Sequence, residues 1–265
     1  MKIYQPNGKA REYSPLACNL YRGCNHGCDY CYVPAVIKLK KETFHSEISC
    51  KEDIRKIVSK EFNKIKNSKE QVFFSFSTDP YNKLEEKEEL TKFAIEQAYQ
   101  NSVPISILTK SSLVLRDMDL FKKFGNSIKV GMTLTFSKEE TSKQIEPEAS
   151  LPNERIEVLK TLKRNGIKTW ASIEPVIIPE QSLEIIKRTL PYVDNYKVGM
   201  VSNYKGIHKQ IDWNLFISKV IPMLREAGKE IYVKTELRSI VNFKFNENET
   251  LMDLFVAKPF NISLF

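Results

Sequence analysis

The sequence lacks the features of a secreted or membrane protein. Its first residues, MKIYQPNGKAREY, contain no apolar segment of the kind that signal peptides carry. No run approaches the roughly 18 apolar residues that a membrane helix needs. Five unevenly spaced cysteines in 265 residues do not make a disulfide framework. We therefore expect a cytoplasmic protein without membrane contact, in a reducing compartment that leaves its thiols free to bind metal.

Low-complexity tracts and Gly/Ser-rich linkers are also absent, which favours one domain over two. Apolar, strand-like runs alternate with helix-like segments along the chain. The expected strands are 17–21, 72–77, 105–110, 128–136, 168–176, 196–202 and 230–236. The expected helices are one that follows a capping box at Ser49–Glu52 and runs to about residue 67, and then 87–101, 115–124, 152–165, 182–192 and 213–227.

The spacing of the strands predicts the fold. Successive strands lie about 25 to 35 residues apart, as in βα units, and most are apolar throughout, as in a parallel sheet covered by helices. We expect an α/β protein with a largely parallel sheet, an open, partial TIM-type (β/α)6–7 barrel. It would be a single domain over 1–265, with its core at about 15–202 and a C-terminal extension, 203–265, that completes the barrel.

Polar residues gather where such a fold places its function, at the C-terminal ends of the strands. The second strand runs into Ser77, Thr78 and Asp79, and charged residues stand in two later strands, Glu174 in the fifth and Lys234 in the seventh. A charge in an apolar strand needs a partner or a ligand. Polar residues at strand ends also serve as ordinary helix caps, so any single one is weak evidence. The prediction of a functional site depends on polar residues at the ends of several strands together.

The net charge is +8. A basic surface attracts nucleic acid or other anions. The lysines are scattered, however, so a general enrichment in lysine on the solvent faces of helices explains the charge equally well.

Three of the cysteines stand within eight residues, in Cys24-Asn-His-Gly-Cys28-Asp-Tyr-Cys31. A closed zinc site needs four ligands and disulfides need pairs. Three neighbouring thiols therefore indicate a metal centre that is open on one side. The alternative is a structural zinc site with a fourth ligand from one of Cys18, His26 or Cys50.

This spacing, with the aromatic Tyr30 just before the third cysteine and the first expected strand just before the motif, resembles the radical S-adenosylmethionine (SAM) superfamily. Longer segments resemble its spore photoproduct lyase-like subgroup, which includes proteins of the DNA-repair photolyase type. They lie between about residues 15 and 200 and are NLYRGCNHGCDYCY, STDPYNKLE, ILTKSSLVLRDMDLF and IEPEASLPNERIEVLKTLKRNGIKTWASIEPVI.

The resemblance implies the cofactors and their ligands. Cys24, Cys28 and Cys31 would hold three irons of a [4Fe–4S] cluster and leave the fourth to SAM, whose reductive cleavage gives a 5′-deoxyadenosyl radical. The other implied SAM contacts are Tyr30 at the adenine, Ser77, Thr78 and Asp79 towards the amino group, Lys110 at the carboxylate, Thr133 and Thr135 at the ribose or methionine part, and Glu174 at SAM or substrate.

The resemblance also implies that the radical takes a hydrogen atom from a substrate, here a base of DNA or RNA that is repaired or modified. A peptide or small molecule is the alternative substrate, and a non-catalytic zinc module that binds nucleic acid is the remaining reading. In spore photoproduct lyase a cysteine after the second strand returns the hydrogen atom, but Phe76 stands in that place. Reversal of a thymine dimer by the same route is therefore not implied.

Four residues are candidates for substrate contact or radical relay: Tyr32, Tyr81, Glu174 and Tyr204. Aromatic and basic residues for stacking and phosphate contact are expected in one late stretch, made up of Tyr204-Lys205, His208-Lys209, Trp213 and Arg238. The chemistry also needs a one-electron donor, such as a flavodoxin or ferredoxin. A further partner protein is a hypothesis.

Overall fold

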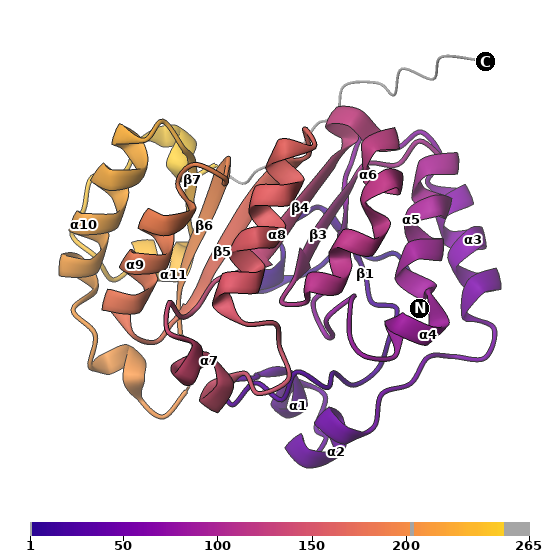
Figure 1. The fold of residues 1–265 in the computed structure, drawn as a ribbon, viewed down its shortest axis with the longest axis horizontal. Coiled ribbons are helices and arrows are strands. Elements are labelled where there is room, and N and C mark those ends of the chain that lie inside the picture. Colours follow the sequence, from indigo (N-terminus) through magenta and orange to yellow (C-terminus); the bar gives the residue numbers. More distant parts are fainter. Residues whose placement is uncertain (1, 202–203, 252–265) are drawn as a thin grey trace.

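The computed structural model describes residues 2–201 and 204–251. Its centre is one sheet of seven strands, all parallel and paired in chain order (Figure 1). The strands are β1 (Leu16–Cys18), β2 (Val72–Phe74), β3 (Ile105–Thr109), β4 (Ile128–Thr133), β5 (Lys168–Val176), β6 (Asn195–Met200) and β7 (Glu230–Val233). The predicted α/β fold with a parallel sheet is confirmed.

The sheet is an open barrel. Pairing runs from β1 to β7, and within residues 2–201 and 204–251 no pairing joins β7 back to β1. In Figure 1, α6 and α8 lie in front of the strands, with α3 and α5 at one side and α9 and α10 at the other. Among the described residues no helix is both long enough and apolar enough to cross a bilayer. The extent of the domain, including the extension 203–265, stays a prediction.

Eleven α-helices connect and cover the strands in the described parts of the chain. They are α1 (Val33–Val36), α2 (Lys41–Ser46), α3 (Ile54–Lys64), α4 (Glu85–Glu88), α5 (Leu90–Gln100), α6 (Met118–Phe124), α7 (Glu139–Ile145), α8 (Pro152–Arg164), α9 (Pro179–Thr189), α10 (Trp213–Glu226) and α11 (Thr235–Arg238). Short 3-10 turns lie at Gly8–Ala10, Ser112–Asp117, Gly125–Ser127, Ile207–Lys209 and Glu247–Glu249.

Several predicted strands extend too far. The strand expected at 72–77 ends at Phe74, because the side-chain oxygen of Asn19 accepts hydrogen bonds from the backbone N–H groups of Phe76 and Ser77. Those groups therefore do not join the strand ladder. The strand expected at 128–136 ends at Thr133. The end of the strand expected at 196–202 lies outside the described residues.

The predicted capping box at Ser49–Glu52 is wrong. Ser49 instead pairs with Arg22 through two backbone hydrogen bonds of 2.8 and 3.0 Å, and α3 begins only at Ile54. The helix expected at 182–192 begins three residues earlier, since Pro179 fits the first helical turn. The helix expected at 87–101 is interrupted at Glu89, whose φ of +45° separates α4 from α5.

The segment before β1 enters the interior of the barrel. Tyr13 packs against Phe73 of β2 and Trp170 of β5, and the ammonium of Lys197 on β6 lies 5.0 Å from the centre of its ring. Trp170 fits inside because β4 has a glycine opposite it: a Cβ on Gly131 would come within 2.4 Å of the indole. This aromatic cluster fills the middle of the barrel and leaves function to its rim.

Candidate active site

The three motif cysteines lie in the loop between β1 and α1, at the C-terminal edge of the sheet. All three are free thiols, with Cys28 buried and Cys24 and Cys31 partly buried. A hydrogen bond of 3.0 Å from the backbone N–H of Cys31 to the carbonyl of Cys28 closes the second half of the loop. Two of the thiols thus stand at the ends of one turn, and Cys24 stands four residues before it.

Two glycines permit this path. Gly23 has φ +75°, and a Cβ there would lie 2.2 Å from the carbonyl oxygen of Glu47. Gly27 has φ +65°, and its Cβ would lie 3.0 Å from the ring of Pro147. A side chain at Gly23 meets backbone that has no room to move, so the loop needs glycine there for both its conformation and its packing.

The electrostatics of the thiols fit a multi-iron cluster. The pKa of Cys28 is raised to about 12, chiefly by burial; the ammonium of Lys110 opposes this shift, and the negative charges of Glu146, Cys24 and Cys31 add to it. Burial likewise raises the pKa of Cys24 to about 11. Thiolates at these positions need a positively charged centre beside them, which iron supplies.

The three motif cysteines match the ligand chemistry of an iron–sulfur cluster. In a [4Fe–4S] cluster each iron can bind its own thiolate, and Cys24, Cys28 and Cys31 offer three thiols within eight residues. Within residues 2–201 and 204–251, no three His, Cys, Asp or Glu side chains are grouped so as to hold one ion.

Lys110 follows β3 and faces the cysteine loop. Its ammonium lies 5.6 Å from the centre of the Tyr30 ring, and its charge acts on all three motif thiols. Burial alone lowers the pKa of Lys110, but the negative charges of Cys28 and Glu146 outweigh burial and the pKa is raised. Lys110 is thus a lasting cation beside the thiols, suited to bind a carboxylate.

Tyr30 is fixed by a buried ion pair that the sequence argument did not identify. Its hydroxyl donates to Glu146, whose other oxygen lies 2.6 Å from the guanidinium of Arg155. Arg155 also donates to the carbonyl of Thr133 at 3.0 Å. The side chain of Thr135 is buried, and its hydroxyl lies 3.5 Å from the hydroxyl of Tyr30. Glu146 and Arg155 both lie in the segment IEPEASLPNERIE. The opposite charges within this one segment were the feature of the sequence from which their contact could have been predicted.

Asp79 binds the loop after β2 to the end of β3. Its carboxylate accepts hydrogen bonds from the hydroxyl of Thr109 at 2.6 Å and from the backbone N–H groups of Lys110 at 2.8 Å and Tyr81 at 2.9 Å. In the same loop the carbonyl of Thr78 accepts a hydrogen bond from Ser75. Asp79 thus positions the backbone on either side of it, including that of Lys110.

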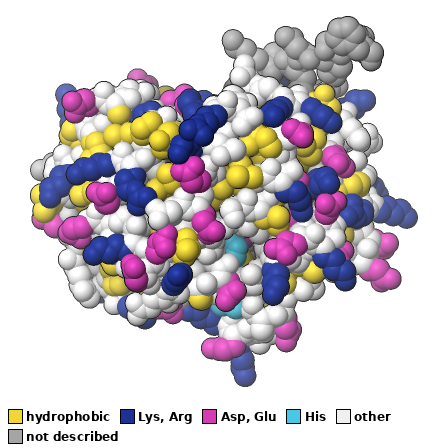
Figure 2. All heavy atoms as spheres, in the orientation of Figure 1, with side chains coloured by type: hydrophobic (Ala, Val, Ile, Leu, Met, Phe, Trp, Pro, Cys, Tyr) yellow, Lys and Arg dark blue, Asp and Glu magenta, His cyan; other side chains and the backbone are white. Residues whose placement is uncertain are grey.

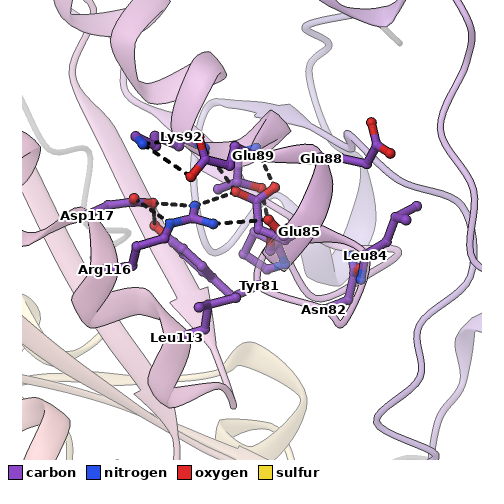
Figure 3. A network of polar contacts seen from close by, with 12 residues as sticks. Tyr81, Asn82, Leu84, Glu85, Glu88, Glu89, Lys92, Leu113, Arg116 and Asp117 are labelled. Carbon is purple, nitrogen blue, oxygen red and sulfur yellow. Dashed lines mark hydrogen bonds and ion pairs between the residues drawn. The ribbon is translucent and has the colours of Figure 1, made fainter.

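A second buried network lies behind this loop (Figure 3). The guanidinium of Arg116 donates to Glu85 at 2.5 Å and to Asp117 at 2.8 and 2.9 Å. Tyr81 donates to Asp117 at 3.0 Å, and Tyr21 donates to Glu85. Tyr81 is therefore occupied in a structural network and is not brought together with the other candidate tyrosines.

Glu174 on β5 lies inside the barrel, where it meets Lys234, the residue that directly follows β7, at 3.0 and 3.1 Å and accepts a hydrogen bond from Tyr13. Its side chain is 19% exposed. Its charge also raises the pKa of Tyr32, for which burial is the larger cause and the result is about 12. The hydroxyl of Tyr32 itself donates to the carbonyl of Phe76 at 3.3 Å.

The stretch proposed for stacking is only partly available. Trp213 is buried and donates to the carbonyl of His208, and Tyr204 is buried with its hydroxyl on Asp29 at 2.6 Å. The expectation that both aromatics stack on bases is wrong as the molecule stands. On the face shown in Figure 2, basic and acidic side chains are interspersed, and no large basic patch is seen there.

The comparisons with known proteins agree with this site. The model of the Radical SAM superfamily matches residues 18–193, which include the cysteine loop, Lys110 and Glu174. The chain belongs to the Radical SAM superfamily. Its members are enzymes whose cofactors are a [4Fe–4S] cluster and SAM.

Two sequence relatives match most of this chain. The uncharacterized protein MJ0683 of Methanocaldococcus jannaschii is 38% identical over 180 residues, which is 67% of each chain. The uncharacterized protein Rv2578c of Mycobacterium tuberculosis is 25% identical over 178 residues, covering 65% of this chain and 52% of the relative. The chain thus matches about half to two thirds of the length of these relatives.

Two solved structures illustrate the fold of this radical SAM protein. Spore photoproduct lyase with its dinucleoside spore photoproduct has a TM-score of 0.60 at 16% identity, covering 83% of this chain and 63% of the lyase. SuiB of Streptococcus suis, bound to the precursor peptide SuiA, has a TM-score of 0.63 at 15% identity, covering 88% of this chain and 54% of SuiB. At such identities the likeness concerns the fold.

Proposed function

We propose that this radical SAM enzyme holds its cluster on Cys24, Cys28 and Cys31 and generates a 5′-deoxyadenosyl radical that takes a hydrogen atom from a base of DNA or RNA. The observation that carries the proposal is the set of three free thiols, from one loop, within the field of Lys110. When bound, the cluster supplies the electron that cleaves SAM.

The chain's own residues would bind and orient SAM. The Lys110 ammonium is suited to the SAM carboxylate, and Tyr30, fixed by Glu146, offers a ring face to the adenine. Ser77 lies on the rim beside the loop that Asp79 fixes, where its hydroxyl would bind the SAM amino group. For Thr78, Thr133 and Thr135 the burial of the side chains favours a supporting role behind the SAM site.

Tyr32 is the best candidate for substrate contact. It follows Cys31 directly and the residue is 57% exposed, while its hydroxyl donates to the carbonyl of Phe76 at 3.3 Å and lies within the field of Glu174. An exposed aromatic ring beside a charged pair is suited to stack on a flat base whose polar edge needs hydrogen bonds. The fold that the chain shares with spore photoproduct lyase supports a nucleic-acid substrate, and the likeness to peptide-bound SuiB supports a peptide as the second candidate.

The first experiment is anaerobic reconstitution with iron and sulfide, followed by reduction with dithionite and addition of SAM. Wild type is expected to bind about four irons and to form 5′-deoxyadenosine. Cys28→Ala is expected to lose both, and Cys50→Ala, which removes a partly buried cysteine outside the motif, is expected to keep both. Zinc in place of iron in wild type would contradict the proposal.

The substrate class is tested with the same enzyme. Single-stranded DNA, RNA and unrelated peptides are added in turn, and formation of 5′-deoxyadenosine is measured with and without each. We expect nucleic acid to stimulate the reaction, and Tyr32→Ala to lose the stimulation while it retains the basal reaction. Stimulation by peptides alone would favour the second candidate.

A further inference from the structure

An exposed apolar ridge lies directly beside the cysteine loop. Val36, Ile37 and Leu39, which we call the apolar ridge, are 70%, 49% and 42% exposed. With Tyr32 they make up four of the seven large hydrophobic side chains that are exposed among the described residues, and they fall within eight positions. Such a concentration of exposed apolar side chains marks an interaction surface.

The apolar ridge is anchored to the cysteine loop on both sides. Before it, the buried Val33 and Pro34 follow Cys31 within three residues. After it, Lys41 donates to the carbonyl and carboxylate of Asp29 at 2.6 and 2.8 Å. The ridge is therefore held in place without a partner, so that docking needs little ordering of the chain.

Further contacts tie α2 to the first cysteine. The backbone N–H of Cys24 donates to the carbonyl of Phe44 at 3.1 Å, and the ring of His45 lies 2.7 Å from the carbonyl of Cys24. Figure 1 shows α1 and α2 projecting from the lower edge of the molecule, beyond the ends of the strands. A partner seated on the ridge therefore lies against the loop that carries the three thiols.

The charges around the ridge favour an acidic partner. The exposed Lys38 lies within it and the exposed Lys40 follows it, and the exposed acids Glu42 and Glu47 stand at the two ends of α2. Lys41 and Lys205 are paired with Asp29, so that its carboxylate does not offset the two exposed lysines. The chain as a whole carries +8. Long-range attraction would therefore steer a negatively charged protein to this edge.

An apolar centre with a charged rim is the usual composition of a protein–protein interface. Binding to nucleic acid depends instead on many lysine and arginine contacts with phosphates, and here three of the four exposed side chains from 36 to 39 are hydrocarbon. The site beside the ridge needs one electron for each SAM that is cleaved. Outside the motif the sequence has only Cys18 and Cys50, too few thiols for a second cluster that would relay it.

We propose that the apolar ridge, with Lys38 and Lys40, is the docking surface for an acidic one-electron donor protein. The proposal rests on the proposed function, because a donor that docks here needs a redox centre at the cysteine loop to accept its electron. In the docked complex the donor loses one electron and the enzyme gains one, and no bond or proton changes place in that transfer. Transient redox complexes have small interfaces, which suits a ridge of three side chains.

The test measures binding and electron delivery separately. Reconstituted enzyme is titrated with oxidised flavodoxin, and in parallel with oxidised ferredoxin, by anaerobic calorimetry at low and high salt. The ridge variant is Val36→Glu/Ile37→Glu and the charge variant is Lys38→Glu/Lys40→Glu. The matched controls change exposed residues elsewhere, Leu215→Glu/Ile240→Glu and Lys123→Glu/Lys219→Glu.

Wild type and both controls are expected to bind one of the two donors with a salt-sensitive Kd. The ridge and charge variants are expected to bind about tenfold more weakly or worse. Formation of 5′-deoxyadenosine should fall by a similar factor when the donor supplies the electrons. It should stay at the wild-type rate when dithionite supplies them, because a small reductant needs no docking surface.

Equal affinities for the donor in the ridge variant and its control would overturn the proposal, as would failure of wild type to bind either donor. Loss of nucleic-acid binding in the ridge variant, with donor binding intact, would reassign the ridge to the substrate. If wild type forms no 5′-deoxyadenosine with dithionite, the proposed function itself fails, and that result is separate from the binding titration.

Discussion

Glu174 of β5 and Lys234, which directly follows β7, form an ion pair across the intervening strand β6, with both carboxylate oxygens within 3.1 Å of the ammonium. The space for this pair comes from Gly199 on β6, where a Cβ would lie 2.7 Å from the carboxyl carbon of Glu174 and 2.9 Å from the side chain of Lys234. Tyr13 from the N-terminal segment completes the contact. Three distant parts of the chain thus meet inside the barrel.

Removal of one partner from this pair should destabilise the fold. Lys234→Met leaves the Glu174 charge largely buried and unpaired, and we expect a loss of about 2–3 kcal/mol in the free energy of unfolding, measured by urea titration. The double variant Glu174→Gln/Lys234→Met should recover part of this loss. The matched control is Lys168→Met, whose partner Glu230 also links β5 to β7 but at an exposed site, where about 1 kcal/mol or less is expected. Equal effects at the two sites would contradict the argument.

The cysteine loop should be sensitive to a single methyl group. Gly23→Ala places a Cβ 2.2 Å from the carbonyl of Glu47, and we expect a loss of more than about 2 kcal/mol together with lower iron uptake. Gly8→Ala is the control, because Gly8 also has a positive φ, +56°, but has nothing within 4 Å of its Cβ. It should cost about 1 kcal/mol and leave iron uptake unchanged. If both variants lose a similar free energy of unfolding, the positive φ alone explains the loss at Gly23, and the contact with Glu47 does not contribute.

The sequence was sufficient for the architecture and the cysteine loop, because both depend on local signals. Apolar runs such as β3 and β4 are almost fully buried, with Leu108 of β3 partly buried, and their regular spacing predicted the parallel order of the strands. The motif spacing predicted three neighbouring thiols, and the superfamily match supports that reading. The SAM contacts of Lys110 and its neighbours stay predictions, although Lys110 does face the thiols.

Contacts between distant segments were the part that the sequence did not reveal. No periodicity links Glu146 to Arg155 or joins Tyr13 to the far side of the barrel, since these pairs depend on how loops fold over the sheet. Helix starts were missed for the same reason: the backbone of Ser49 is taken by Arg22, which lies in another loop. The burial of Trp213 likewise follows from packing against α10 neighbours such as Phe216.

A pH-dependent contribution to stability is expected from Asp194, which joins the starts of β5 and β6 to α8. Burial raises the pKa of Asp194, but its contacts with Lys163 and with the backbone N–H of Thr169 at 2.9 Å outweigh burial and lower it. A carboxyl whose pKa is lower in the folded state stabilises the fold above its unfolded pKa, and this contribution is lost as the pH falls through the folded pKa.

Asp194→Asn is therefore expected to cost about 1–2 kcal/mol near pH 7. The difference from wild type should shrink as the pH falls below about 4, the usual pKa of aspartate. Urea unfolding at a series of pH values measures both. Asp119→Asn, at an exposed site on α6, should show no such difference at any pH. A gap between Asp194→Asn and wild type that stays constant down to pH 2 would contradict the assignment to the charge of Asp194.

The role of Lys110 can be separated from that of the cysteines. Lys110→Met retains most of the side-chain volume but removes the cation that faces the thiols and the Tyr30 ring. Because a hydrogen bond to a charged group contributes about 1.5–3 kcal/mol, we expect SAM to bind at least about tenfold more weakly to the reconstituted variant, measured by anaerobic calorimetry. Iron content should stay at the wild-type value, since the three thiols remain. Lys123→Met, on the exposed side of α6, is the control for loss of one positive charge. Unchanged affinity for SAM in a Lys110→Met protein with a full complement of iron would show that the SAM carboxylate binds elsewhere, and the partly buried hydroxyl of Ser77 would then be the next to test.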